Sequence, residues 1–471
     1  MSLGILRIAA VLERAGYDVD VLDLSGIENY LDVVDDYSRQ AGARTFCLTA
    51  TTPQMPSAVK IAERLAGRGK LILGGPHATL VAAAVKKGSL RAQRAMYELK
   101  KFFDVVVAGD GERAIFAVLE EGCTRLIDAD DPKSSFFLTN QALDELPFPA
   151  RHLIDMESYH YQIDGERATS LICQLGCPFG CGFCGGRASP MLRRVRTRTT
   201  ASVVAELRHL HETYGYKGFM LYDDELNVNP QMVGMMNAIA DLQEELGVQF
   251  KLRGFIKAQL FTEGQAEAMY RAGFRWILTG FESGSPRILQ NIQKRATRGE
   301  NTRCVEIARR AGLKVKALMS MGHPGESLET IQETRSWLLE NKPDDFDVTI
   351  ITPYPGSPYY DEAVEEEPGE WVYTFQATGD KLYAKEVDYF KTADYYKGDP
   401  NGGYKSYVWT DALSVGDLVR ERDSLERDVR AALGIAFNPS APSVTFEHSM
   451  GQGLPPSILR SSQKEAMSHA V

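Results

Sequence analysis

The sequence predicts an α/β fold in two units: an open Rossmann-like sheet with helices on both faces, then a partial (β/α)6 barrel of the TIM type. Three observations predict it. Short apolar runs alternate with amphipathic helical patterns over residues 1–125 and again over 168–365. A stretch rich in Asp and Pro, residues 126–167, separates the two regions as a linker. The apolar runs of the first unit end in turns rich in Gly, Pro or Thr, where parallel sheets place their ligand sites.

The first unit begins with an expected helix over residues 3–15. Strands are then expected at Tyr17–Leu22, Thr45–Thr49, Lys70–Leu73 and Asp104–Val107. A sheet of this kind normally opens with a strand, so the first strand is missing from the pattern. The turns after the later strands form the candidate ligand-binding edge; they contain Thr51, Thr52 and Pro53, then Gly74, Gly75 and His77, then Gly109, Gly111 and Glu112.

The second unit contains six expected strands, each followed by a helix: Ser170–Cys173, Gly218–Tyr222, Lys251–Phe255, Trp276–Phe281, Lys314–Met319 and Asp347–Thr352. In a barrel, chemistry lies at the carboxyl ends of such strands. A small α-rich region over residues 366–435 should follow, with a helix over Ser414–Leu433, and then a disordered tail over 436–471. The aromatic residues of 371–409 either close the barrel mouth or pack this region against the barrel.

The composition indicates a cytoplasmic protein without nucleic-acid or membrane partners. Its 44% hydrophobic and 25% charged residues are typical of soluble proteins, and the net charge of −10 disfavours a nucleic-acid partner. No run of about 18 apolar residues predicts a membrane helix. Four of the seven cysteines lie close together in sequence, which in a cytosolic chain indicates metal or redox chemistry; they are Cys173, Cys177, Cys181 and Cys184.

The strongest motif is C-x3-C-x2-C, formed by Cys177, Cys181 and Cys184 directly after the first barrel strand. A [4Fe–4S] cluster usually takes four protein thiolates, so three leave one iron open to another ligand. Two alternatives compete. A structural zinc site would need a second cysteine pair, which the sequence lacks. Cys173 would serve as a fourth ligand, but its apolar surroundings favour a buried, unreactive residue.

The cysteine motif resembles that of the radical S-adenosylmethionine (SAM) superfamily, and further motifs agree with the family in order. Gly280-Phe-Glu-Ser-Gly284 resembles the strand whose Glu contacts the SAM ribose. Gly322-His-Pro-Gly-Glu326 resembles the turn that lines the adenosine pocket, and Asp223-Asp-Glu225 the turn for the SAM amino group. Lys257 stands where relatives usually have Arg. The resemblance therefore implies SAM contacts from Phe183, Asp223, Glu225, Glu282, Gly322 and Pro324.

The first unit resembles the cobalamin-binding domain that precedes the barrel in B12-dependent members of that superfamily. The resemblance implies cobalamin contacts from Leu3, Gly4, Thr51, Thr52, Pro53, Gly74, Gly75, His77, Gly109, Gly111 and Glu112. The Asp-x-His-x-x-Gly motif that ligates cobalt in cobalamin mutases is absent, so His77 is not assigned as a cobalt ligand, and its position beside Pro76 favours a turn-capping residue. A degenerate Rossmann-like domain that only packs against the barrel is the alternative.

Together these resemblances imply an enzyme with three cofactors: a [4Fe–4S] cluster, SAM and cobalamin. The expected reaction is radical methyl transfer to an unactivated carbon of a small molecule or a peptide, with electrons from a flavodoxin- or ferredoxin-type donor. Two alternatives remain: a radical cyclisation or rearrangement without methyl transfer, and a non-catalytic protein that binds the iron–sulfur cluster or cobalamin.

Overall fold

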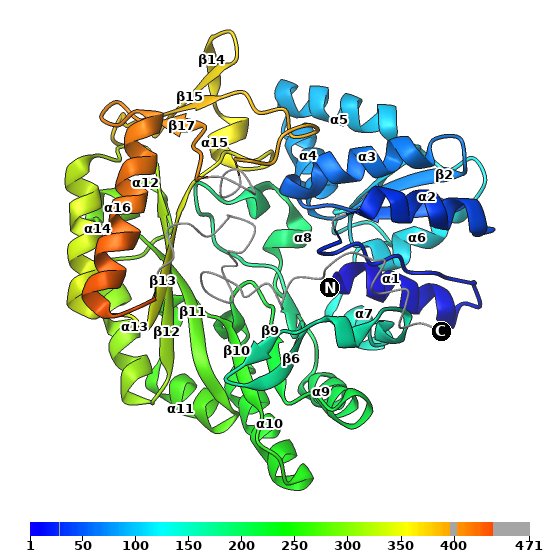
Figure 1. Cartoon of the computed structure of the whole chain (residues 1–471), viewed down its shortest axis with the longest axis horizontal. Coiled ribbons are helices and arrows are strands. Elements are labelled where there is room, and N and C mark those ends of the chain that lie inside the picture. Colours follow the sequence, from blue (N-terminus) through cyan, green and yellow to red (C-terminus); the bar gives the residue numbers. More distant parts are fainter. Residues whose placement is uncertain (28, 396–402, 437–471) are drawn as a thin grey trace.

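The first unit of the computed structural model, which describes residues 1–27, 29–395 and 403–436, is a parallel sheet covered by helices on both faces (Figure 1). The strands lie in the order β1 (Thr45–Thr49), β2 (Lys70–Gly74), β3 (Val105–Gly109) and β4 (Leu126–Ala129). One face packs against α2 (Tyr30–Gln40), α3 (Met55–Leu65), α4 (Pro76–Lys86) and α5 (Leu90–Phe102). The other face packs against α6 (Gly111–Leu119), which contacts α1 (Leu3–Arg14). The expected doubly wound unit is thus confirmed.

Two expectations for this unit need correction. Tyr17–Leu22 is not a strand: the segment pairs with no strand of the described residues and lies across a cavity from β1. Residues 126–167, expected as a linker, contain β4, which pairs in parallel with β3, and the short helix α7 (Asn140–Glu145). β4 was not predicted, because Asp and Pro residues surround it and its four residues are too few to show the alternation of apolar and polar residues that is typical of a strand.

The second unit is a curved sheet in the order β13-β12-β11-β10-β9-β6-β5. Six strands are parallel: β6 (Glu166–Leu171), β9 (Gly218–Leu221), β10 (Lys251–Phe255), β11 (Phe274–Glu282), β12 (Lys314–Met321) and β13 (Asp345–Ile350). The outer helices are α9 (Thr200–Tyr214), α10 (Met232–Leu246), α11 (Glu263–Arg271), α13 (Arg298–Arg310) and α14 (Leu328–Asn341). The partial barrel is therefore confirmed, and the largest apolar core lies between this sheet and these helices.

The C-terminal region is mixed rather than α-rich. It contains an antiparallel sheet of β14 (Val364–Glu367), β15 (Glu370–Thr374), β16 (Lys381–Lys385) and β17 (Val408–Trp409) before the helix α16 (Val415–Leu433). The sequence did not predict these strands, because aromatic residues occur in packed surfaces of every kind and do not indicate a strand in particular. The helix begins and ends as expected: the Ser414 side chain accepts from the Asp417 backbone, and Gly434 adopts a left-handed conformation. The expected tail lies outside the described residues, apart from residue 436.

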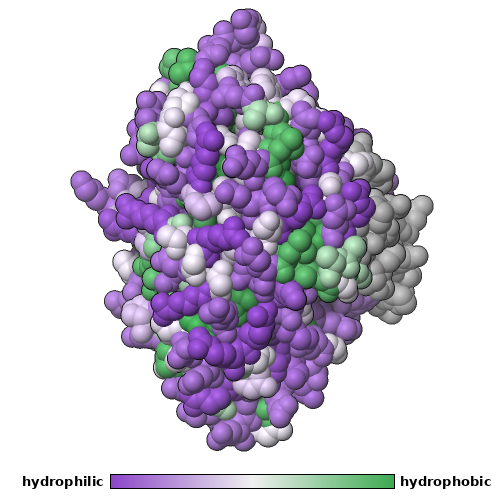
Figure 2. Space-filling view, turned by 90° about the vertical axis from the view of Figure 1, so that its left-hand side faces the viewer, coloured by the Kyte–Doolittle hydropathy of each residue, from purple (hydrophilic) through white to green (hydrophobic). Residues whose placement is uncertain are grey.

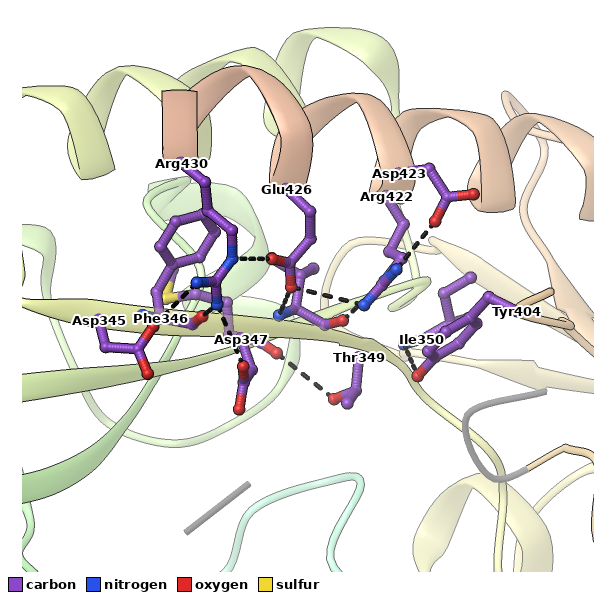
Figure 3. A network of polar contacts seen from close by, with 12 residues as sticks. Asp345, Phe346, Asp347, Thr349, Ile350, Tyr404, Arg422, Asp423, Glu426 and Arg430 are labelled. Carbon is purple, nitrogen blue, oxygen red and sulfur yellow. Dashed lines mark hydrogen bonds and ion pairs between the residues drawn. The ribbon is translucent and has the colours of Figure 1, made fainter. Parts of the chain in front are cut away.

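α16 covers β13, the edge strand of the barrel, through buried ionic contacts (Figure 3). The Val348 backbone N–H donates to Glu426 at 2.7 Å, and Glu426 pairs with Arg430 at 2.7 Å. Arg430 also pairs with Asp345 at 3.0 Å and donates to the Phe346 carbonyl. These side chains thus satisfy backbone groups that an uncovered edge strand would expose.

The surface around α14 and α16 is mostly hydrophilic, with hydrophobic residues scattered in small groups (Figure 2). Among the described helices, none combines the length and apolar character that a membrane crossing requires.

Candidate active site

The cysteine loop lies at the carboxyl end of the barrel, between β6 and α9. Two carboxylates fix its entrance: Asp223 accepts from the Cys173 and Gln174 backbone N–H groups at 2.7 and 3.0 Å, and Asp224 accepts from Gly176 N–H at 3.0 Å. Gly176 has φ +88°, and a Cβ there would lie 2.1 Å from the Arg194 carbonyl oxygen. The turn that presents the first cysteine therefore requires glycine.

The three motif cysteines lie together, while Cys173 is separate. Cys184 interacts electrostatically with both Cys177 and Cys181. Cys173 is fully buried in the barrel core two residues after β6, as the sequence indicated. Burial raises the pKa of the Cys177 thiol to about 12 and that of Cys184 to about 11. The free thiols therefore stay protonated at neutral pH, and a metal must displace these protons on binding.

Two buried lysines bring positive charge to the cysteine loop. The Lys257 ammonium lies 4.1 Å from the ring centre of Phe179, inside the loop, and Lys294 is paired with Glu282 at 2.7 Å. Both lysines act electrostatically on Cys181 in the direction that lowers its pKa, although burial dominates and the pKa is raised overall. The cysteine loop therefore lies near two ammonium groups, one of which is paired with Glu282.

Glu282 is held at the end of β11 by a chain of buried hydrogen bonds. Its second carboxylate oxygen accepts from the Ser320 hydroxyl at 2.7 Å, and Ser320 lies 2.7 Å from Nε2 of His323. His323 Nδ1 lies 3.2 Å from the Tyr359 hydroxyl. Burial lowers the pKa of His323 to about 4, so the ring is neutral at pH 7. We assign the proton to Nε2, because Ser320 already donates to Glu282 and the Tyr359 hydroxyl then donates to Nδ1.

Glu282 adopts φ +64°, and the strand is irregular there. A Cβ at Gly280 would lie 2.4 Å from a Glu282 carboxylate oxygen and 2.6 Å from the Lys294 ammonium. The glycine of the Gly-Phe-Glu motif therefore makes room for the ion pair. The sequence drew attention to Glu282 but not to Lys294, which lies outside any motif, nor to Ser320 and His323 as its partners.

The other expected SAM residues surround this chain of contacts. Phe183, inside the cysteine motif, lies 5.4 Å from the His323 ring, and the Pro324 carbonyl accepts from Asn291 at 2.8 Å. Gly322 has φ +88° in the same turn. Glu225 is buried among the two lysines and Glu282, and burial raises its pKa to about 7. One oxygen of Glu225 and one of Asp223 have no hydrogen-bond partner within the described residues.

In the front unit, the turns after β1 and β2 meet at His77. Its backbone N–H donates to the Ala50 carbonyl, and Nδ1 lies 3.1 Å from the Thr52 hydroxyl. Gly75 has φ +91°, and a Cβ there would lie 2.3 Å from the Thr49 hydroxyl, whereas a Cβ at Gly74 would meet nothing within 4 Å. His77 therefore caps the turn, while its Nε2 has no partner among the described residues.

Among the remaining expected cobalamin residues, Gly109 is linked to this turn through Thr79, whose hydroxyl donates to the Gly75 carbonyl, whereas the others contact α1 and α6. Gly111 packs against α1, since a Cβ there would lie 2.8 Å from Ile8, and Glu112 is buried where it interacts with Arg7. Leu3 is buried in the first turn of α1 and Gly4 is exposed. Gly109 donates its N–H to Thr79 and packs against the end of β4. These residues contribute to the packing of α1, α6 and β4, whereas Thr51, Thr52, Pro53, Gly74, Gly75 and His77 form one edge.

The front unit and the barrel are joined directly beside the cysteine loop. Asp110 pairs with Arg196 at 2.5 Å, and both side chains are buried. Asp130 accepts from the Ser189 hydroxyl at 2.6 Å and from the Met191 N–H at 2.8 Å. The loop itself contacts α4, because a Cβ at Gly185 would lie 3.1 Å from Leu80. Carboxylates that follow β3 and β4 thus hold the segment that follows the cysteines.

The aromatic segment joins the two units, which supports the packing interpretation. The Arg91 guanidinium of α5 lies 3.7 Å from the ring centre of Tyr360 and 4.3 Å from that of Trp371, and it pairs with Glu386 at 2.9 Å. Tyr389 and Phe390 lie 6.5 and 6.3 Å from the His77 ring. The segment therefore also covers the edge at His77.

Two known families match this chain. Residues 1–119 match the B12 binding domain, and residues 171–338 match the Radical SAM superfamily. The chain belongs to the B12-dependent radical SAM superfamily. An enzyme of this superfamily uses a [4Fe–4S] cluster and SAM, and its B12-binding domain implies cobalamin as a third cofactor.

Several known proteins align with most of the length of this radical SAM enzyme. An uncharacterized methyltransferase of Pyrococcus horikoshii is 26% identical over 77% of this chain and 78% of its own length. The anaerobic magnesium-protoporphyrin IX monomethyl ester cyclase of Cereibacter sphaeroides is 25% identical over 75% of this chain and 59% of its own length. The structure of the radical SAM methyltransferase TsrM of Kitasatospora setae, with cobalamin and a [4Fe–4S] cluster bound, has 17% identity, a TM-score of 0.66 and covers 90% of this chain and 87% of that one.

The donor groups of this B12-dependent radical SAM enzyme fit the three cofactors. Three thiols near two lysines suit an anionic cluster with one open iron. No three His, Cys, Asp or Glu side chains of the described residues are arranged to hold one metal ion, whereas a cluster takes each thiolate on a different iron. Unpartnered carboxylate oxygens of Asp223 and Glu225 suit an amino group, and the turn at Gly74, where a Cβ would meet nothing within 4 Å, suits the close approach of a large ring with amide side chains.

Proposed function

We propose that this chain is a cobalamin-dependent radical SAM methyltransferase that acts on an unactivated carbon of a small molecule or a peptide. One observation carries the proposal: the cysteine loop contacts α4, the helix that begins at Pro76, beside His77 on the candidate cobalamin edge. Two cofactor regions on a common face are what radical chemistry coupled to cobalamin requires. The methyltransferases of Pyrococcus horikoshii and Kitasatospora setae support the same reaction class.

In this reaction the residues of the chain bind and orient the cofactors and shield them from water. When bound, the cluster and SAM supply a radical that removes a hydrogen atom, while cobalamin supplies the methyl group. Cys177, Cys181 and Cys184 hold the cluster, and Lys257 and Lys294 offset its negative charge. Glu282, fixed by Lys294 and Ser320, accepts hydrogen bonds from the ribose, and Glu225 accepts from the SAM amino group. Tyr389 and Phe390 limit the access of water at His77.

The decisive experiment measures both products of SAM with the anaerobically reconstituted enzyme, cobalamin, a chemical reductant and candidate substrates. Methyl transfer consumes one SAM as the methyl donor and one as the radical source. S-adenosylhomocysteine and 5′-deoxyadenosine should therefore form in equal amounts, with one methyl group added per pair. S-adenosylhomocysteine without deoxyadenosine would contradict the radical step.

A cyclase is the second candidate, because the Cereibacter sphaeroides cyclase matches three quarters of this chain. In that case deoxyadenosine forms without S-adenosylhomocysteine, and the product gains no methyl group. The same assay therefore separates the two candidates.

The proposal includes a one-electron donor of the flavodoxin or ferredoxin type and a cytoplasmic location, because reduced clusters and free thiols need a reducing compartment. Replacing the chemical reductant with such a protein should sustain turnover.

A further inference from the structure

A positively charged side chain is buried in the barrel without a counter-ion. Arg253, in the middle of β10, is 8% exposed. Its buried Nε has no hydrogen-bond partner, and no ion pair within the described residues includes this guanidinium. A guanidinium cannot lose its proton in a protein, so the charge itself is buried, at a cost in stability. The packing of the barrel alone therefore does not explain this residue.

Other buried arginines of the described chain lie beside acids. Arg151 and Arg198 both pair with Glu206, at 2.9 and 2.5 Å. The charge of Glu206 also attracts Arg7. These side chains compensate one another where the front unit meets the barrel, and Arg253 differs from them in that respect.

Arg253 points to the concave, inner face of the curved sheet. Its chain neighbours Leu252 and Ile256 belong to the core beneath the outer helices, so the alternation of a strand directs Arg253 to the opposite face. The ring centre of Trp276 on β11 lies 5.7 Å from the guanidinium carbon of Arg253. Ile277, next to Trp276, lies in the same outer core, so the Trp276 ring is on the inner face too.

Three acids toward the amino ends of the barrel strands are bound to other groups. Lys316, the buried cation of β12, pairs with Asp345 at 3.1 Å and with Asp347 at 2.8 Å. Asp164, on the turn between β5 (Gln162–Ile163) and β6, accepts from the Trp276 indole N–H at 3.1 Å. Arg253 is thus left to bind an acid that comes from outside the described chain.

Apolar side chains line the inner face between Arg253 and the cysteine loop. The strand register places Phe255 beside Leu278, one step closer to the loop, and Leu318 follows on β12. Lys257, which lies against the cysteine loop, is four residues beyond Arg253, or about 13 Å of extended chain. An elongated molecule on this face would have one end beside Arg253 and the other beside the cysteine loop.

The geometry points to an anion site: we infer that Arg253 binds a carboxylate or phosphate group of the substrate, at the end of an apolar molecule distant from the carbon that reacts. A planar guanidinium binds either group through two parallel hydrogen bonds, and the neighbouring Trp276 ring limits its orientation. Naming this ligand as the substrate rests on the proposed function, whereas the anion site itself does not.

Binding to the full chain tests the site apart from turnover. Isothermal titration calorimetry is performed without reductant, with and without SAM and cobalamin, so a failure of the proposed reaction leaves the test intact. The probes are octyl phosphate and octanoate, with octanol as the neutral probe. Arg253→Met removes the charge and keeps an unbranched side chain. Arg275→Met is the matched control, because Arg275 is on the neighbouring strand and donates to the Tyr270 and Phe274 carbonyls.

The wild type should bind octyl phosphate or octanoate about tenfold more tightly than octanol, and the tighter of the two anions identifies the group that the site prefers. Arg253→Met should lose this preference, and Arg275→Met should keep it. Arg253→Met should also unfold at a denaturant concentration no lower than that of the wild type, because an apolar side chain replaces an unpaired buried charge.

Three results would each overturn the inference. The first is a wild type that binds the anions no more tightly than octanol. The second is an equal preference in Arg253→Met and the wild type, or an equal loss in Arg275→Met. The third is an Arg253→Met protein that is destabilised or does not fold, because the guanidinium would then serve the packing of the barrel.

Discussion

The two sheets of this molecule differ at their edges. On the barrel, Glu426 and Arg430 of α16 bind backbone groups of β13, so that edge is closed by side-chain charges (Figure 3). On the front sheet, β1 borders a cavity of about 1150 Å³. The candidate sites follow the same division. The barrel side relies on paired buried charges such as Glu282 and Lys294, and the front side relies on backbone turns around Gly75 and His77. The barrel site is thus held mainly by buried charges, and the front site mainly by backbone geometry.

The variant with the largest expected effect tests whether the barrel and the front unit hold their cofactors independently. Replacing Cys177, Cys181 and Cys184 together with Ala should abolish the cluster absorbance and paramagnetic signal completely, because no motif thiolate remains. Cobalamin retention should persist, since the front turns are unchanged. Cys173→Ala is the matched control: this buried cysteine lies outside the group, so the cluster should remain. Loss of the cluster in that variant would refute the ligand assignment.

A large loss of stability is expected at the closed edge of the barrel. Glu426→Ala leaves the buried Arg430 guanidinium without its closest carboxylate, and breaking a buried pair in this way costs about 3–5 kcal/mol. Chemical denaturation followed by circular dichroism measures it. The control is Asp428→Ala, two residues further along α16; its side chain is 45% exposed where it pairs with Arg335, so stability should change by less than about 1 kcal/mol. Equal effects would show that the ionic contacts do not hold α16.

A pH-dependent effect is expected from Glu326, which is buried before α14. Burial raises its pKa to about 7 from 4.5, so between these values the folded state binds more protons than the unfolded state. The free energy of unfolding should therefore fall as pH rises from 4.5 to 7 and level off above it, by at most about 3 kcal/mol. Glu326→Gln should remove this contribution, as seen from melting temperatures at pH 5 and 8. Glu329→Gln, exposed in the first turn of α14, should leave the pH dependence as in the wild type.

The smallest effect, a modest loss of cobalamin affinity, is expected when one side chain of the front unit is changed. Thr52→Val removes the hydrogen bond to His77 Nδ1, worth about 1 kcal/mol, and should weaken cobalamin affinity about fivefold in equilibrium dialysis. Gly75→Ala should cost more, because its Cβ would lie 2.3 Å from the Thr49 hydroxyl at φ +91°. A complete loss of binding in Thr52→Val with unchanged circular dichroism would mean that side chains, not backbone turns, hold the cofactor.

The features that the sequence predicted are local ones. The cysteine loop, the turns at Thr52 and Gly75, and the barrel strands are each encoded within a few consecutive residues. Contacts between distant segments were not predicted: Lys294 reaches Glu282 from a separate loop, and Glu112 faces Arg7 of α1 instead of an open edge. Periodicity shows that a residue lies at the end of a strand, but not which neighbour it meets there.

The order of synthesis affects access to His77, because the aromatic residues that cover it are made late. Tyr389 and Phe390, which lie against the His77 ring, follow the whole barrel in the sequence. The ribosome therefore completes the front sheet and the six barrel strands before it makes this cover. During that interval the edge at His77 lacks these two aromatic residues, so a nascent chain offers a large cofactor a more open entry than the finished protein does.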